Sequence, residues 1–166
     1  ETVHYSGSAD GGDGEGLPAS AYCWAVVFHH GLHAHPFLGP LFGVTNGTFT
    51  IPTSGETSSD VYYRIHLTVT NAAGLPHSVT TDIRPRTAVI SLLTSPPGLQ
   101  VTLGGQPMIA PVTFTGVVGM ARALGVISPQ TLSGTSYGFV KWSDGGAVTH
   151  AITTPESNTT YTASLI

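Results

Sequence analysis

The sequence predicts an all-β fold made of two small β-sandwich units. Short runs rich in Val, Ile, Thr and aromatic residues alternate with turns rich in Gly, Pro, Asn and Ser. In YRIHLTVTN the apolar residues Ile65, Leu67 and Val69 alternate with polar residues, which is the pattern of a half-buried antiparallel strand. Helical periodicity is nearly absent, because the one candidate, residues 117–127 (VVGMARALGVI), contains glycines that disfavour a helix.

The expected strands are short and separated by turn residues. In the first half of the chain we expect strands at 21–28, 47–51, 62–70 and 78–83. In the second half we expect them at 88–94, 100–103, 112–115, 137–142, 149–153 and 160–165. The sequence RPR at residues 84–86 places two cations around a proline, which favours a short linker over a strand. The predicted domains are therefore 1–86, which holds seven of the eight histidines, and 87–166.

Composition narrows the class of protein. Of the 166 residues 40% are hydrophobic and only 8% are charged, a balance typical of secreted all-β proteins, so we expect an extracellular location. Five Lys and Arg residues in a chain of net charge −4 cannot form the basic surface that nucleic acid or anionic lipid requires. No membrane-spanning segment is expected either. The only cysteine, Cys23 in CWAVVF, is expected to be a buried small side chain, and no intrachain disulfide can form.

The first predicted unit resembles the polycystic-kidney-disease (PKD) type of immunoglobulin-like domain over roughly residues 3–84. The resemblance rests on YSGSADGGDGEGLPASAYCWAVVF, on YYRIHLTVTNAAGL and on SVTTDI. It implies an immunoglobulin-like sandwich with Trp24 in the core. The sequence departs from the family where Trp-x-Phe-Gly-Asp-Gly is usual, because Trp24 is followed by AVVFHHGLHAHP.

The second unit resembles small β repeats at the C-termini of secreted bacterial proteins. FVKWSDGGAVTHAITTPESNTTYTASL carries this resemblance, and TSPPGLQVTLGGQP is similar to PEGA-type surface modules. The pair of units is similar to the C-terminal accessory region of secreted bacterial sugar dehydrogenases of the sorbosone/glucose type, which use pyrroloquinoline quinone. The resemblance concerns accessory modules only, because the chain is too short for the quinone-binding propeller.

The nine residues FHHGLHAHP (28–36) contain four of the eight histidines. Strand alternation places His30 on the face of Trp24, which is expected to point inward, and His29 on the opposite face. One of these two imidazoles, with the two from the following loop, would leave a fourth coordination position open and would suit Zn or Cu. The predicted metal ligands are His29, His30, His33 and His35.

Other side chains bear on this site. Glu56 or Asp60 could complete a coordination shell, and His66 and His77 are alternatives from other strands. Two further interpretations stay open: a solvated loop whose histidines bind nothing, or a loop that contacts a ligand directly.

Two further binding sites are suggested by motifs. Asp10, Asp13 and Glu15 in DGGDGEG offer closely spaced oxygen ligands for calcium, although the spacing is not that of an EF-hand and such turns need no ion. Tyr137 and Trp142 in YGFVKWSDGG would stack on a sugar ring if exposed. Packing of Trp142 in the second core is the favoured interpretation.

The same choice between stacking and packing applies to Tyr62 and Tyr63 beside Arg64. Asn46 and Asn158 fit the pattern for N-glycosylation.

Taken together, the sequence favours a non-catalytic extracellular accessory module. It would bind carbohydrate or a cell-surface polymer, with a His-held metal that stabilises the first unit. One alternative is a small copper-dependent redox enzyme that acts on polysaccharide. Another is a structural subunit of a surface fibre that self-assembles through strand edges. Nucleophilic catalysis is disfavoured because the sequence has no G-x-S-x-G elbow, and no Walker or dinucleotide motif occurs.

Overall fold

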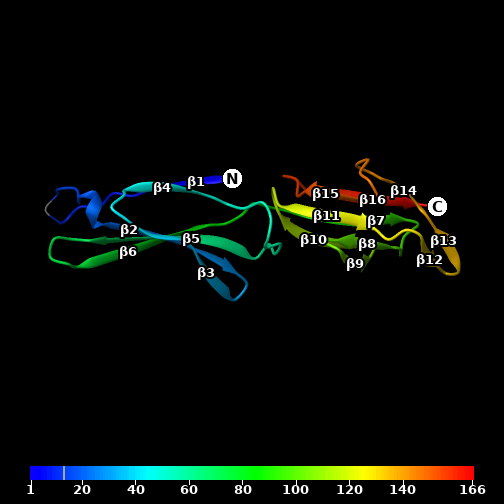
Figure 1. Cartoon of the computed structure of the whole chain (residues 1–166), viewed down its shortest axis with the longest axis horizontal. Coiled ribbons are helices and arrows are strands. Elements are labelled where there is room, and N and C mark those ends of the chain that lie inside the picture. Colours follow the sequence, from blue (N-terminus) through cyan, green and yellow to red (C-terminus); the bar gives the residue numbers. More distant parts are fainter. Residues whose placement is uncertain (13) are drawn as a thin grey trace. The chain divides into compact units, whose positions relative to one another are not determined.

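The computed structural model describes residues 1–12 and 14–166 (Figure 1), and across them the chain is an all-β protein, as predicted. Apart from one short 3-10 turn, η1 (Ala19–Ala21), every regular element in these residues is a strand. The chain divides into two compact units. Unit 1 comprises Glu1–Pro52 and Asp60–Pro85, and unit 2 comprises Thr53–Ser59 and Arg86–Ile166.

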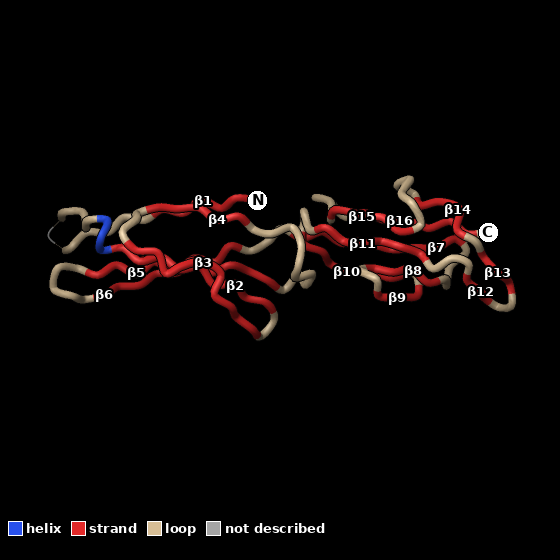
Figure 2. The backbone as a smooth tube through the Cα atoms, in the orientation of Figure 1, coloured by secondary structure: helices blue, strands red, loops and turns tan. Residues whose placement is uncertain are grey.

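Unit 1 contains a four-stranded antiparallel sheet and a two-stranded one. The larger sheet has the order β3-β2-β5-β6 and the smaller pairs β1 with β4. Their bounds are β1 (Thr2–Ser6), β2 (Tyr22–His30), β3 (His33–Phe42), β4 (Asn46–Thr50), β5 (Val61–Thr70) and β6 (Pro76–Ile83). The β2–β3 hairpin projects from the rest of its sheet (Figure 2).

The core of unit 1 lies on one face of β2 and β5, and its large side chains are mostly aromatic. Trp24 is 3% exposed, its indole N–H donates to the Val44 carbonyl at 2.9 Å, and its ring lies 4.7 Å from that of Tyr5. The predicted alternation along β2 and the inward orientation of Trp24 are confirmed. The buried cluster is Tyr5, Tyr22, Trp24, Val26, Phe49, Tyr63, Ile65, Leu67 and Val69.

Strand β3 was not predicted, because HAHPFLGPLF carries two prolines and no clear alternation. A proline is tolerated here because β3 is an edge strand, bonded only to β2. Gly39 is required at its position, because its φ is 91° and a Cβ there would lie 2.6 Å from the Trp24 carbonyl oxygen. Because β3 pairs with β2 over most of its length, the residues that follow the histidines extend the sheet and do not form an irregular loop.

Unit 2 is a sandwich of two four-stranded sheets, with orders β10-β7-β16-β14 and β15-β11-β8-β9, and a small β12-β13 hairpin. Strand β16 runs parallel to β7, and the other pairs are antiparallel. The strands are β7 (Thr87–Ser95), β8 (Gln100–Leu103), β9 (Gln106–Ile109), β10 (Val112–Val117), β11 (Ala121–Val126), β12 (Gln130–Leu132), β13 (Thr135–Tyr137), β14 (Phe139–Trp142), β15 (Thr149–Thr153) and β16 (Thr159–Leu165).

The two sheets of unit 2 enclose a continuous apolar core. Its members are Ile90, Leu92, Leu99, Val101, Leu103, Ala110, Leu124, Val126, Trp142, Ile152, Tyr161, Ala163 and Leu165. Residues 117–127, the weak helix candidate, form the end of β10, a turn at Gly119 and strand β11. Among the described residues no helix has the length and apolar character to cross a membrane.

Candidate functional site

The four histidines of FHHGLHAHP are divided between the two faces of the β2–β3 hairpin. In the hairpin register His30 pairs with His33, Phe28 with His35, and His29 with Ala34. Residues directly opposite each other in an antiparallel pair project to the same face. His30, His33 and His35 therefore share the face that carries the core, and His29 projects to the outer face.

On the core-side face His30 and His35 are in direct contact. Their Nε2 atoms lie 3.0 Å apart and their rings are stacked, with centroids 5.1 Å apart. One ring must donate and the other accept, so at least one of the two imidazoles is neutral in this contact. The rings of Phe28 and His33 lie 5.6 and 5.5 Å from that of His30.

The four-histidine ligand set does not form. Neighbouring residues of a strand point to opposite faces, so His29 is separated from the others. Within residues 1–12 and 14–166 no group of three or more His, Cys, Asp or Glu side chains is arranged to hold a metal ion. Of the further candidates, Asp60 lies next to the hairpin, where its carbonyl accepts from the Gly31 N–H at 3.0 Å. The other three are dispersed: Glu56 belongs to unit 2, His66 projects to the outer face of β5, and His77 lies on β6.

On the outer face His29 belongs to a row of three planar groups that crosses strands β2, β5 and the end of β6. The His29 and Tyr62 rings are stacked with centroids 4.3 Å apart and an angle of 5° between their planes. The guanidinium carbon of Arg84 lies 4.6 Å from the Tyr62 ring centroid. In the β2–β5 pair, Tyr62 of β5 lies opposite His29 of β2. Arg84 directly follows Ile83 of β6, which lies opposite Tyr63 of β5. The Tyr62 ring therefore lies between an imidazole and a guanidinium.

One step along the same face, Arg64 and Asp82 form a two-pronged ion pair. Arg64 donates from Nε to Oδ1 at 2.7 Å and from Nη2 to Oδ2 at 3.0 Å, and Arg84 donates to Oδ2 at 3.3 Å. The hydrogen bond from Arg64 is the main cause that lowers the pKa of Asp82; desolvation opposes it, and the nearby positive charges add to it. The same bond raises the pKa of Arg64. The group therefore carries two positive charges and one negative charge.

Within this cluster, the sequence points to Tyr62 and Arg64 but not to Asp82 and Arg84. The missing signal was the matching i, i+2 spacing in two neighbouring strands, YxR in β5 and DxR at the end of β6. Once β5 and β6 are paired, this spacing brings Tyr62 to Arg84 and Arg64 to Asp82. Tyr63, the other candidate, is buried in the core of unit 1.

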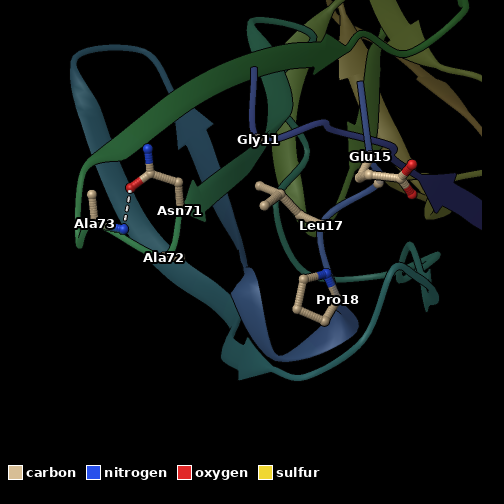
Figure 3. A pocket seen from close by; sticks show the side chains of 8 residues that line it. Gly11, Glu15, Leu17, Pro18, Asn71, Ala72 and Ala73 are labelled. Atoms are coloured by element: carbon tan, nitrogen blue, oxygen red, sulfur yellow. Dashed lines mark hydrogen bonds between the residues drawn. The ribbon is translucent and has the colours of Figure 1, made fainter. Parts of the chain in front are cut away.

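The acidic loop near the start of unit 1 is organised by its own backbone. Asp10 Oδ1 accepts from the Gly12 N–H at 3.0 Å, and the Gly11 N–H donates to the Glu15 carbonyl. Asp13, the third predicted calcium ligand, lies outside the described residues. Glu15 lines an open cleft of about 370 Å³ that also faces Asn71 (Figure 3), whose Oδ1 accepts from the Ala73 N–H. The Asp10 carboxylate thus serves a turn, and calcium binding stays a prediction.

In unit 2 the two predicted sugar-stacking residues differ in their exposure to solvent. Trp142 is 1% exposed and packs in the core, and Tyr137 is half-buried against that core. Stacking on Trp142 is therefore wrong, because the apolar interior between the two sheets takes up the whole indole. The favoured interpretation, packing in the second core, is confirmed.

The WSDGG segment contains a contact between Asp144 and His150 that the sequence pattern does not reveal. Asp144 Oδ2 lies 3.0 Å from His150 Nε2, and His150 Nδ1 lies 2.8 Å from the Ala147 carbonyl. Burial alone would raise the pKa of Asp144, but hydrogen bonds from the Gly146 N–H and His150, with the charge of His150, lower it. A Cβ at Gly146 would overlap the His150 ring, so the second glycine of the motif lets the ring close over the loop.

No protein-family model matches the chain, and no curated protein matches it significantly. Function must therefore be argued from the sites themselves. In the outer-face group of unit 1, charged and aromatic side chains from three strands converge at the surface. We call His29, Tyr62, Arg64, Asp82 and Arg84 the outer-face cluster.

Proposed function

We propose that the chain is a non-catalytic accessory module that binds an extracellular carbohydrate or cell-surface polymer through the outer-face cluster of unit 1. The observation that carries the proposal is the row in which Tyr62 is held between His29 and Arg84. The resemblance of the sequence to accessory modules of secreted proteins supports the same conclusion, and so does the low charge of the chain.

The cluster suits binding better than catalysis. Its guanidinium groups stay charged at every physiological pH, so they donate hydrogen bonds but do not act as bases. Stacking and the Arg64–Asp82 pair already fix the side chains, and a ligand that meets fixed donors loses less conformational entropy on binding. Polysaccharides offer many hydroxyl and carboxylate acceptors for such donors.

Affinity electrophoresis in gels that contain different polysaccharides tests the proposal. We expect the chain to be retarded by at least one polysaccharide, and Tyr62→Ala to remove the retardation because the row loses its central ring. Arg86→Gln is a matched control, since Arg86 is exposed and pairs with Glu156 in unit 2. Retardation by no polysaccharide, or equal retardation of the Tyr62 variant, would contradict the proposal.

A second candidate function is transition-metal binding by the β2–β3 hairpin. The observation that favours it is the 3.0 Å separation of the Nε2 atoms of His30 and His35. Two imidazole nitrogens on one tetrahedral zinc ion lie about 3.3 Å apart, given Zn–N distances of about 2.0–2.1 Å. A small opening of the pair, with His33 turning inward or water as further ligands, would make a site. A copper ion held there is also what the predicted redox enzyme would need.

Calorimetric titration with Zn²⁺ and Cu²⁺ tests this candidate. We expect about one metal ion per chain, and a loss of affinity of at least tenfold in His35→Ala. His29→Ala is the matched control, because His29 is adjacent to His30 in sequence but projects to the other face. Equal losses in the two variants would show that the ion does not use the His30–His35 pair.

A further inference from the structure

We propose that the ligand of the outer-face cluster is an acidic polysaccharide, recognised through the carboxylates of its uronic-acid units. This inference rests on the proposed function of the same site, and it adds the chemical class of the ligand. The occupant we infer is therefore a carboxylated glycan chain rather than a neutral one.

The charge of the outer-face cluster favours a negatively charged ligand. The chain has only five Lys and Arg residues and a net charge of −4, yet Arg64 and Arg84 lie together on one face with Asp82 as their only acidic partner in the cluster. The cluster is thus a positively charged patch on a chain of net negative charge. Around it His66 and Thr80, which pair across β5 and β6, extend the face with groups that carry no negative charge.

The Arg84 guanidinium has N–H donors that are available to a ligand. Its side chain is 64% exposed, and its one hydrogen bond within the described residues is the 3.3 Å contact with Asp82. A guanidinium carries five N–H donors in a planar fork, and two of them match the two oxygens of a carboxylate. The Tyr62 ring and Asp82 hold this fork in place while leaving most of its donors to solvent.

The row also argues against recognition of a neutral sugar by stacking. The Tyr62 ring is stacked on the His29 ring at 4.3 Å, and the guanidinium carbons of Arg84 and Arg64 lie 4.6 and 5.3 Å from its centroid, so its faces are largely occupied within the cluster. What the row presents outward is therefore edges: an imidazole edge, a phenolic hydroxyl and a guanidinium. Such edges recognise acceptors and negative charge rather than the apolar C–H face of a sugar ring.

The experiment uses the full chain and three probes: polygalacturonate, the same polymer after methyl esterification, and dextran sulfate. Titration calorimetry at low and moderate salt gives the affinities. We expect binding to polygalacturonate and at least tenfold weaker binding to the ester, which keeps the sugar but loses the charge. We expect Arg84→Gln to weaken polygalacturonate binding by about tenfold or more and Arg86→Gln to leave it unchanged, with thermal melts as the check that both variants fold.

The outcomes separate this inference from the proposed function. Equal affinity for the ester, or binding to neutral polysaccharides only, would overturn the carboxylate inference and leave the binding module standing. Binding to no polysaccharide would overturn both. Stronger binding to dextran sulfate than to polygalacturonate, with no loss in Arg84→Gln, would show general charge attraction and would also overturn the inference.

Discussion

The two units cover their apolar cores in different ways. In unit 2 two four-stranded sheets face each other, and thirteen residues form the buried cluster, of which only Trp142 and Tyr161 are aromatic. In unit 1 a four-stranded sheet faces only two strands, and five of the nine buried residues are aromatic. Large rings such as Tyr5 and Phe49 reach from the small sheet, so fewer strands cover the core.

Because only two strands lie over the four-stranded sheet of unit 1, part of the core-side face of that sheet is exposed. Val79, on the core-side face of edge strand β6, is 51% exposed. A groove of about 200 Å³ opens there between the end of β1 and β6, with Trp24 and Leu67 in its lining. His33 and His35, on the core-side face of the hairpin, are also exposed. Unit 1 thus leaves polar and titratable groups accessible on both faces, whereas unit 2 encloses its core and uses the Asp144–His150 pair to close a loop.

The largest effect should come from the core of unit 2. We expect Trp142→Ala to lower the free energy of unfolding by about 3–5 kcal/mol, because it leaves a cavity the size of an indole between two complete sheets. Urea unfolding followed by circular dichroism measures the change. Val140→Ala, on the same strand and half exposed, should change it by no more than about 0.5 kcal/mol. A loss for Trp142→Ala as small as that of the control would contradict the enclosed core.

A smaller change in stability is expected from the WSDGG loop of unit 2. Gly146→Ala should lower the free energy of unfolding by about 1–3 kcal/mol, because the added methyl group would displace the His150 ring from Asp144. The matched control is Gly138→Ala, where a Cβ would meet its nearest neighbour at an ordinary 3.7 Å. If thermal melts show equal stability for both variants, the ring does not depend on close approach to Gly146.

The sequence predicts most of the strands of both units but not the contacts between them. Nine of the ten expected strands are present, and the one expected at 137–142 is interrupted at Gly138, which separates β13 from β14. These strands were readable because two-residue alternation and turn residues are local signals. Strand β3 was missed because an edge strand needs neither alternation nor an unbroken set of N–H donors. The partition of His29 from His30 followed from alternation. That His29 meets Tyr62 and His30 meets His35 did not, because those contacts depend on register between strands.

The ionisation of Asp144 gives a test that depends on pH. Its pKa is lowered in the folded chain, so the carboxylate stabilises unit 2 above the pKa of an unfolded Asp, about 3.9, and that stabilisation is lost as the pH falls through the lower folded-state pKa. Asp144→Asn should therefore lower the urea midpoint at pH 6, and its difference from the natural chain should shrink as the pH falls below about 4. A difference that stays constant from pH 6 to pH 2 would show that the contact does not involve the ionised carboxylate.

The smallest effect should come from the thinly covered face of unit 1. Val79→Thr replaces a half-exposed apolar side chain on an edge strand by one of nearly equal shape, and threonine also suits a strand. We expect a change in the free energy of unfolding of about 0.5 kcal/mol or less in urea titrations. The same substitution at Val101, which is fully buried between the sheets of unit 2, should cost about 1–3 kcal/mol because its hydroxyl would lack a partner. If Val79→Thr also costs about 1–3 kcal/mol, its side chain is buried in solution by a contact that the chain alone does not supply. Assembly through the β6 edge would produce such a contact.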